Sequence, residues 1–197
     1  NKKIGLGQPV FIIAEAGVNH NGNLKLARKM VDAAKSAGSD AIKFQTFKTE
    51  DVVTKDAPQA NYQRKNSFNR SQFEMLKSIE LNERDFRNLS EYCKKNRIIF
   101  LSTPFDSESA EFLFELGVKA FKVRSGELTN SPLLIQIARY KKPIILSTGM
   151  ANLKEIQTAI QTIQKQFGGA SMHANILFVN TAMILKNLVT FMRTFQR

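Results

Sequence analysis

The sequence predicts an α/β fold in which a parallel sheet is covered by helices. Short apolar runs typical of buried strands recur along the chain, and most of the intervals between them carry helical patterns. The runs are continuously apolar rather than alternating, as expected for strands that are buried on both faces of a parallel sheet. With 197 residues, 43% of them hydrophobic, the chain is long enough for one sizeable core.

Each element is predicted from its own pattern. The expected strands are PVFIIAEAG (9–17), DAIKFQT (40–46), RIIFLSTPF (97–105), VKAFKVRSGE (118–127), KPIILSTGM (142–150) and a sixth that begins at ANILFVN. Helical spacing of apolar residues predicts helices over 23–38, 106–117, 131–142 and 152–169. Gly38 is a typical residue just beyond a helix end, and Asp106 is a candidate N-cap. A long polar insertion, 47–82, follows the second strand, and its length suggests a functional loop.

Composition limits the possible classes of function. The net charge of +12 invites a nucleic-acid interpretation, but the basic residues are spread among acidic ones rather than clustered. A small anionic substrate explains a positive cleft equally well. No apolar stretch reaches the roughly 18 residues of a membrane span, so we expect a cytoplasmic protein without membrane or nucleic-acid partners. Cys93 lies on a predicted helix and is expected to be structural.

Polar residues follow the predicted strands, where ligands gather in parallel α/β folds. Two of them, Lys43 and Lys122, lie within apolar strand sequence. A buried lysine is costly unless an anion or a carboxylate lies beside it. The two lysines could bind an anionic ligand, or they could pair with Glu15 and Glu127 as internal salt bridges. His20, after the first strand, could orient a ligand or stabilise its own loop.

The assembled motifs resemble those of the sialic acid synthase family, which includes N-acetylneuraminate, legionaminate and pseudaminate synthases. IIAEAGVNHNGNLKLARKMVDAAKSAGSDAIKFQTF, FLSTPFD, FKVRSGELTN and KPIILSTGM occur in the order and spacing of that family, over roughly residues 8–165. The resemblance implies a TIM-type (β/α)8 barrel. It also implies a transferase that condenses phosphoenolpyruvate with an N-acetylated amino sugar, such as N-acetylmannosamine, to a nine-carbon sialic acid and releases phosphate.

The same resemblance implies roles for individual residues. The phosphoenolpyruvate site would comprise Glu15, Lys43, Thr103, Lys122, Ser125 and Ser147. Glu127 and Lys122 would be catalytic, with Glu127 near the aldehyde of the sugar. In the long insertion, Tyr62, Gln63 and Asn66 would contact the sugar. The family also implies a divalent metal, Mn or Mg, and a possible homodimer.

The resemblance stops near residue 170. Phe178 and Val179 stand where the family has a histidine-cysteine pair, and both family metal histidines are missing, so no metal ligand is predicted. Arg124 is a second departure, because the family has a small residue or proline there. We therefore expect part of a synthase barrel, with about five or six strands, over 1–170 and a divergent tail over 171–197. The C-terminal antifreeze-like domain of the family would be absent.

Three functions remain open on the sequence. The first is a synthase of the sialic acid type. The second is an inactive fragment that binds a phosphorylated ligand or packs on a partner chain. The third, a nucleic-acid binder, is the least supported, because the basic residues are dispersed.

Overall fold

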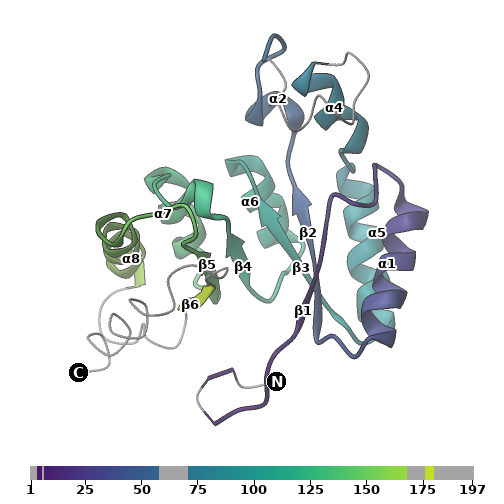
Figure 1. Ribbon diagram of the computed structural model, residues 1–197, viewed down its shortest axis with the longest axis horizontal. Coiled ribbons are helices and arrows are strands. Elements are labelled where there is room, and N and C mark those ends of the chain that lie inside the picture. Colours follow the sequence, from purple (N-terminus) through teal and green to yellow (C-terminus); the bar gives the residue numbers. More distant parts are fainter. Residues whose placement is uncertain (1–3, 6, 58–70, 168–175, 180–197) are drawn as a thin grey trace. The chain divides into compact units, whose positions relative to one another are not determined.

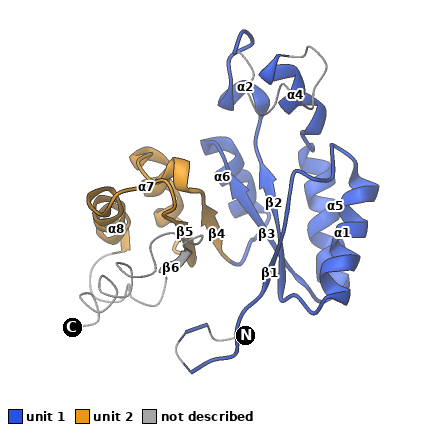
Figure 2. Ribbon diagram, viewed as in Figure 1, with its two compact units in different colours: residues 1–119 blue, residues 120–197 orange. Residues whose placement is uncertain are grey.

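The computed structural model describes residues 4–5, 7–57, 71–167 and 176–179 and shows strands alternating with helices (Figure 1). The chain divides into two compact units, residues 1–119 and 120–197 (Figure 2). Within the described ranges, no helix is both long and apolar enough to cross a membrane.

The first unit contains a parallel sheet with the strand order β1-β2-β3. Its strands are β1 (Ile13–Gly17), β2 (Ala41–Thr46) and β3 (Ile99–Pro104). The three predicted strands are confirmed, although each predicted run extends beyond the observed strand. The register places Glu15 opposite Lys43, and Lys43 opposite Leu101. Paired residues of neighbouring strands share a face of the sheet, so the register alone brings these three side chains to one face.

Helices α1 (Leu24–Ser36), α5 (Glu83–Lys95) and α6 (Ser107–Glu115) pack on the strands of this sheet. Asn23, Asn82 and Asp106 cap them by accepting a hydrogen bond from the backbone of the first turn, which confirms the cap predicted at Asp106. The polar insertion is not a plain loop, because its described residues include two short helices, α2 (Thr49–Val52) and α4 (Gln72–Ile79). A capping box between Ser71 and Glu74 explains why α4 begins there.

An aromatic cluster joins the sheet to the helices of the first unit. Phe44 of β2 stacks on Phe100 of β3 with ring centroids 5.9 Å apart, and Phe86 of α5 meets Phe100 edge-on at 6.5 Å. Each buried ring of this kind contributes roughly 1.5–3 kcal/mol by leaving water. Because β residues alternate between faces, packing Phe44 on this side directs Lys43 and Gln45 to the opposite face.

The second unit contains a parallel sheet of β4 (Phe121–Val123), β5 (Ile144–Ser147) and β6 (Ile176–Val179), in that order. Helices α7 (Ser131–Arg139) and α8 (Leu153–Phe167) pack against each other and bury apolar residues such as Leu134, Ile137 and Ile160. Asn130 caps α7, and Pro132 occupies its first turn, where a missing N–H costs nothing.

One predicted strand of this unit is too long. The run 118–127 was expected to be strand throughout, but β4 ends at Val123, and Ser125–Glu127 form a 3-10 turn. The Glu127 N–H donates to the Arg124 carbonyl at 3.0 Å, which closes the turn. This turn places Glu127 beyond the end of the sheet.

Candidate functional site

Lys43 of β2 lies at the centre of the first group of predicted site residues. The residue is 9% exposed. Its ammonium forms an ion pair with the Glu15 carboxylate of β1, and Nζ lies 3.5 Å from the Thr103 hydroxyl of β3. The structure therefore brings three predicted residues together. The Lys43–Glu15 salt bridge, one of the two alternatives left open by the sequence, is present. The Glu15 side chain is 55% exposed, which leaves the pair accessible from solvent.

Lys122 of β4 is the centre of the second group. It is 8% exposed, and its ammonium donates to the Val123 carbonyl at 2.9 Å and to the Ser147 hydroxyl of β5. The register explains the second contact, because Lys122 pairs with Ile145, and Ser147 lies two residues further along the same face. Ser125 begins the turn that follows this strand.

The two lysine groups have the same local geometry. In each unit, a buried lysine reaches the hydroxyl that lies two residues beyond its register partner on the next strand: Thr103 beyond Leu101, and Ser147 beyond Ile145. In parallel sheets this displacement is toward the carboxyl end of the strands, where loops can enclose a ligand. Each group can therefore present an ammonium and a hydroxyl to an anion.

Glu127 does not pair with Lys122 in the way that the salt-bridge alternative required. Its carboxylate accepts hydrogen bonds from the Arg124 guanidinium and from the Asn130 amide, whose nitrogen lies 2.7 Å away. Its side chain is 13% exposed. The sequence signalled Arg124 only as a departure from the family, and the role of Asn130 was not anticipated. Both contacts follow from the turn, because it brings together residues that are three positions apart in the sequence.

The remaining predicted residues have different outcomes. Tyr62, Gln63 and Asn66 lie outside the described residues, so their sugar-binding role stays a prediction. His20 is described, and its Nδ1 accepts a hydrogen bond from the Gly22 N–H at 3.1 Å, which is the loop-stabilising alternative. Most of the divergent tail, 171–197, also lies outside the described residues.

The family resemblance implies a divalent metal, Mn or Mg. Within the described ranges, no three His, Cys, Asp or Glu side chains are grouped in a way that could hold an ion. Mg²⁺, however, is usually held by one or two carboxylates together with substrate phosphates and water, so it does not require a three-ligand protein group.

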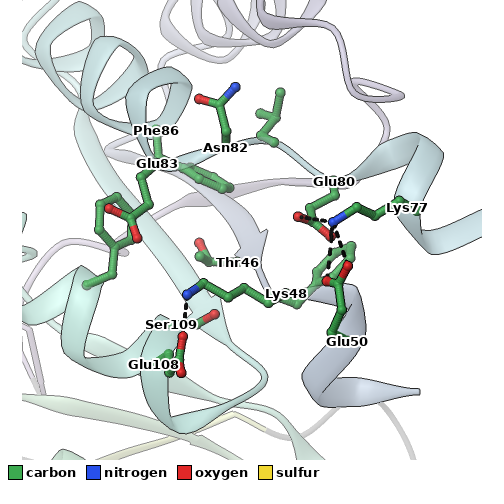
Figure 3. Close-up of a pocket in the computed structure, with 13 residues that line it drawn as sticks. Thr46, Lys48, Glu50, Lys77, Glu80, Asn82, Glu83, Phe86, Glu108 and Ser109 are labelled. Carbon is green, nitrogen blue, oxygen red and sulfur yellow. Dashed lines mark hydrogen bonds and ion pairs between the residues drawn. The ribbon is translucent and has the colours of Figure 1, made fainter. Parts of the chain in front are cut away.

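A cavity of about 320 Å³ lies in the first unit (Figure 3). Phe47, Leu81, Phe86 and Phe112 supply apolar lining. The charged side chains around it pair with one another, Lys77 with Glu50 and Glu80, and Lys48 with Glu108, as the dashed lines in Figure 3 show. None of the predicted site residues is among the described residues that line this cavity, which separates it from the candidate site.

Comparisons with known proteins define the class of fold first. One similar structure is that of N-acetylneuraminic acid (sialic acid) synthetase from Leptospira borgpetersenii, solved in complex with citrate. The match covers 98% of this chain and 65% of that protein, with a TM-score of 0.73 and 30% sequence identity. A spore coat polysaccharide biosynthesis protein from Bacillus subtilis matches 91% of this chain and 46% of its own, with a TM-score of 0.71 and 35% identity. These similarities confirm the α/β fold of TIM-barrel type, with six strands among the described residues.

The sequence comparisons then define the family. The NeuB family matches residues 30–179, and the chain belongs to this family. The N,N'-diacetyllegionaminic acid synthase of Legionella pneumophila is 49% identical over 170 residues, which are 86% of this chain and 48% of that protein. The human N-acetylneuraminate-9-phosphate synthase is 34% identical over 161 residues, 82% of this chain and 45% of that protein. The chain thus spans about half the length of these curated relatives.

Proposed function

We propose that this chain carries the phosphoenolpyruvate-binding part of a sialic acid-type synthase, which joins phosphoenolpyruvate to an N-acetylated amino sugar and releases phosphate. Family membership supports a synthase, since relatives of this chain are named for legionaminic acid and N-acetylneuraminate-9-phosphate synthesis. The proposed site comprises Glu15, Lys43, Thr103, Lys122, Ser125 and Ser147. We expect the reaction to occur in the cytoplasm.

The observation that carries this proposal is the repeated pairing of a buried lysine with a hydroxyl. Phosphoenolpyruvate has two anionic groups, a phosphate and a carboxylate, and each can take a charge-assisted hydrogen bond from an ammonium and a further bond from a hydroxyl. Lys43 with Thr103 and Lys122 with Ser147 supply two such donor pairs. Lysines that are about 9% and 8% exposed interact with an anion more strongly than lysines surrounded by water.

Binding an anion at Lys43 requires a change in its ion pair. Glu15 already neutralises Lys43, so a bound phosphate or carboxylate would have to share the ammonium with it or displace it. The exposed Glu15 side chain can turn toward solvent, and the bound anion then replaces it as the partner of the buried Lys43 ammonium. We propose that Glu15 holds the Lys43 side chain in position until the substrate arrives.

The proposed reaction forms one carbon–carbon bond and exchanges the C2–O bond to phosphate for a C2–O bond from water. C3 of phosphoenolpyruvate attacks the aldehyde carbon of the sugar, which leaves negative charge on the aldehyde oxygen and positive character at C2. Water adds at C2, and the tetrahedral intermediate collapses with loss of phosphate. Lys43 and Lys122 would stabilise the phosphate and carboxylate charges throughout. Glu127 would accept a proton from the attacking water, or it would orient the group that donates a proton to the aldehyde oxygen.

The experiment that tests this proposal measures phosphate release by the purified chain with Mn²⁺ present. We expect release only when phosphoenolpyruvate and an N-acetylated amino sugar are supplied together, with N-acetylmannosamine and the diacetylated sugar of the legionaminate type as the first two candidates. Release without any sugar would contradict the condensation. Saturable binding of phosphoenolpyruvate without release would support the binding site alone, and would indicate that the chain needs further residues for turnover.

A further inference from the structure

His20 is a buried histidine in the loop between β1 and α1. The residue is 1% exposed, and its ring lies 6.0 Å from the Phe44 ring of β2 at an angle of 42°. Nδ1 accepts the Gly22 N–H at 3.1 Å, so the hydrogen of the neutral ring resides on Nε2. A protonated ring carries hydrogens on both nitrogens and could not accept this bond. The loop geometry therefore requires the neutral ring.

Gly22, the residue that His20 holds, lies directly against the last turn of α4. Its φ of +70° belongs to the left-handed region, and a Cβ added there would lie 2.6 Å from the Ser78 carbonyl oxygen. No other residue could bring the backbone this close. The loop after β1 is therefore docked on the end of α4 through Gly22.

The same end of α4 also holds the loop after β2. Glu80, two residues beyond Ser78, accepts hydrogen bonds from the Thr49 N–H at 2.9 Å and the Thr49 hydroxyl at 2.6 Å. Thr49 is the first residue of α2 and lies three residues after Thr46, the end of β2. The segment from Ser78 to Glu80 thus connects the loops that leave the strands of Glu15 and Lys43.

We propose that His20 is a positioning residue, whose Nδ1 acceptor holds the loop after β1 on the end of α4 and so fixes the relative positions of Glu15 and Lys43. The link itself rests on contacts in the first unit alone. Its consequence for phosphoenolpyruvate rests on the function proposed above.

The surroundings of His20 make the link sensitive to pH. Burial lowers the pKa of His20 below 6.5. Among the charged groups of the neighbouring elements, Lys43 of β2 pairs with Glu15 of β1, and Lys77 of α4 pairs with Glu50 and Glu80. On α1, Arg28 lies over the Tyr92 ring and Asp32 accepts from the Tyr92 hydroxyl. Because the folded protein disfavours the charged ring, stability contributed by neutral His20 is complete above about pH 6.5 and is lost as the pH falls from there toward the lowered pKa.

Two substitutions distinguish the effect of the Nδ1 hydrogen-bond acceptor from the effect of the apolar packing of the His20 ring. His20→Asn keeps an acceptor oxygen near the position of Nδ1 and cannot be protonated in this range, whereas His20→Leu keeps apolar packing on Phe44 without an acceptor. The measurements are amide hydrogen exchange in peptides 16–23 and 76–82 of the full chain, at about pH 7.5 and about pH 5.5, and the Kd for phosphoenolpyruvate.

We expect His20→Leu to exchange about tenfold faster than wild type in both peptides at pH 7.5 and to bind phosphoenolpyruvate several-fold more weakly. His20→Asn should keep the wild-type protection, and should lose less of it than wild type on acidification. Wild-type protection in His20→Leu, or equal acid sensitivity in wild type and His20→Asn, would overturn the proposal. If His20→Leu fails to fold, the comparison of His20→Asn with wild type still decides. If wild type binds no phosphoenolpyruvate, the proposed function is wrong, but the hydrogen-exchange measurements still test the positioning role of His20.

Discussion

Arg124 donates from both Nε and Nη2 to the same carboxylate oxygen of Glu127, at 3.1 Å and 2.5 Å. The other oxygen accepts from Asn130, which also caps α7 by accepting from the Leu133 N–H at 3.3 Å. Glu127 is thereby fixed between a cation and the start of a helix. Arg124 is a departure from the family resemblance, so this chain holds its proposed catalytic carboxylate by a contact of its own.

Replacing Arg124 tests whether that contact serves the reaction. A charge-assisted hydrogen bond contributes about 1.5–3 kcal/mol, so Arg124→Met should lower kcat for phosphate release by about tenfold or more if Glu127 must be held in place. Arg124→Lys, which keeps the charge, should recover part of the loss. KM for phosphoenolpyruvate should change little in either variant. An unchanged kcat in Arg124→Met would show that Glu127 does not depend on Arg124.

Removing the ammonium of Lys43 should separate binding from stability. Lys43→Met leaves Glu15 without its partner, but the Glu15 side chain is 55% exposed and can be hydrated. We therefore expect the free energy of unfolding, measured in urea, to change by less than about 1 kcal/mol. Affinity for phosphoenolpyruvate should fall at least about tenfold, because a charge-assisted hydrogen bond is lost.

Lys48 is the matched control for that substitution. It lies five residues further along the chain, is 45% exposed and pairs with Glu108 beside the separate cavity. Lys48→Met should leave phosphoenolpyruvate affinity unchanged. Equal losses in the Lys43 and Lys48 variants would show a general effect of positive charge rather than a site.

Two glycines with similar backbone angles should respond differently to alanine. Gly22 and Gly38 have φ of +70° and +77°, but an added Cβ meets the Ser78 carbonyl only at Gly22, while nothing lies within 4 Å at Gly38. Gly38→Ala should cost about 1–2 kcal/mol from the left-handed conformation alone. Gly22→Ala should cost distinctly more, since a backbone atom must also move. Equal losses of stability on thermal unfolding would contradict the close approach of Gly22 to α4.

Cys93 should be inert in the folded protein. It is fully buried on α5, and burial raises the pKa of its thiol to about 12. The reactive thiolate is therefore almost absent at about pH 8. We expect iodoacetamide to leave Cys93 unmodified in buffer at that pH and to alkylate it fully in denaturant, as mass spectrometry can measure. Rapid alkylation of the folded chain would contradict its burial.

Much of the fold could be predicted because local patterns and packing agree. The apolar runs that contain Ile42, Phe44 and Phe100 are strands, and the cap at Asp106 forms where the sequence indicates it. Strand ends were less predictable. The run 118–127 is apolar enough for a strand up to Val123, but the Ser-Gly pair that follows turns the chain through a backbone hydrogen bond that periodicity does not reveal.

The candidate site was predictable only in part, for a related reason. Lys43 and Lys122 were recognisable as polar residues in apolar strands, and the parallel register then explains their contacts with Thr103 and Ser147. Whether Glu127 would meet Lys122 or another cation depends on side-chain reach within a turn. The sequence left open whether Lys122 would bind an anion or pair with Glu127, and the structure pairs Glu127 with Arg124.

We propose that Lys43 and Lys122 both contribute to phosphoenolpyruvate binding. Isothermal titration of phosphoenolpyruvate into the wild-type chain and into the Lys43→Met, Lys122→Met and Lys48→Met variants tests it most directly. We expect one saturable site per chain in wild type and in Lys48→Met. In Lys43→Met and in Lys122→Met, the affinity for phosphoenolpyruvate should fall at least about tenfold. Wild-type affinity in either Lys43→Met or Lys122→Met would contradict it.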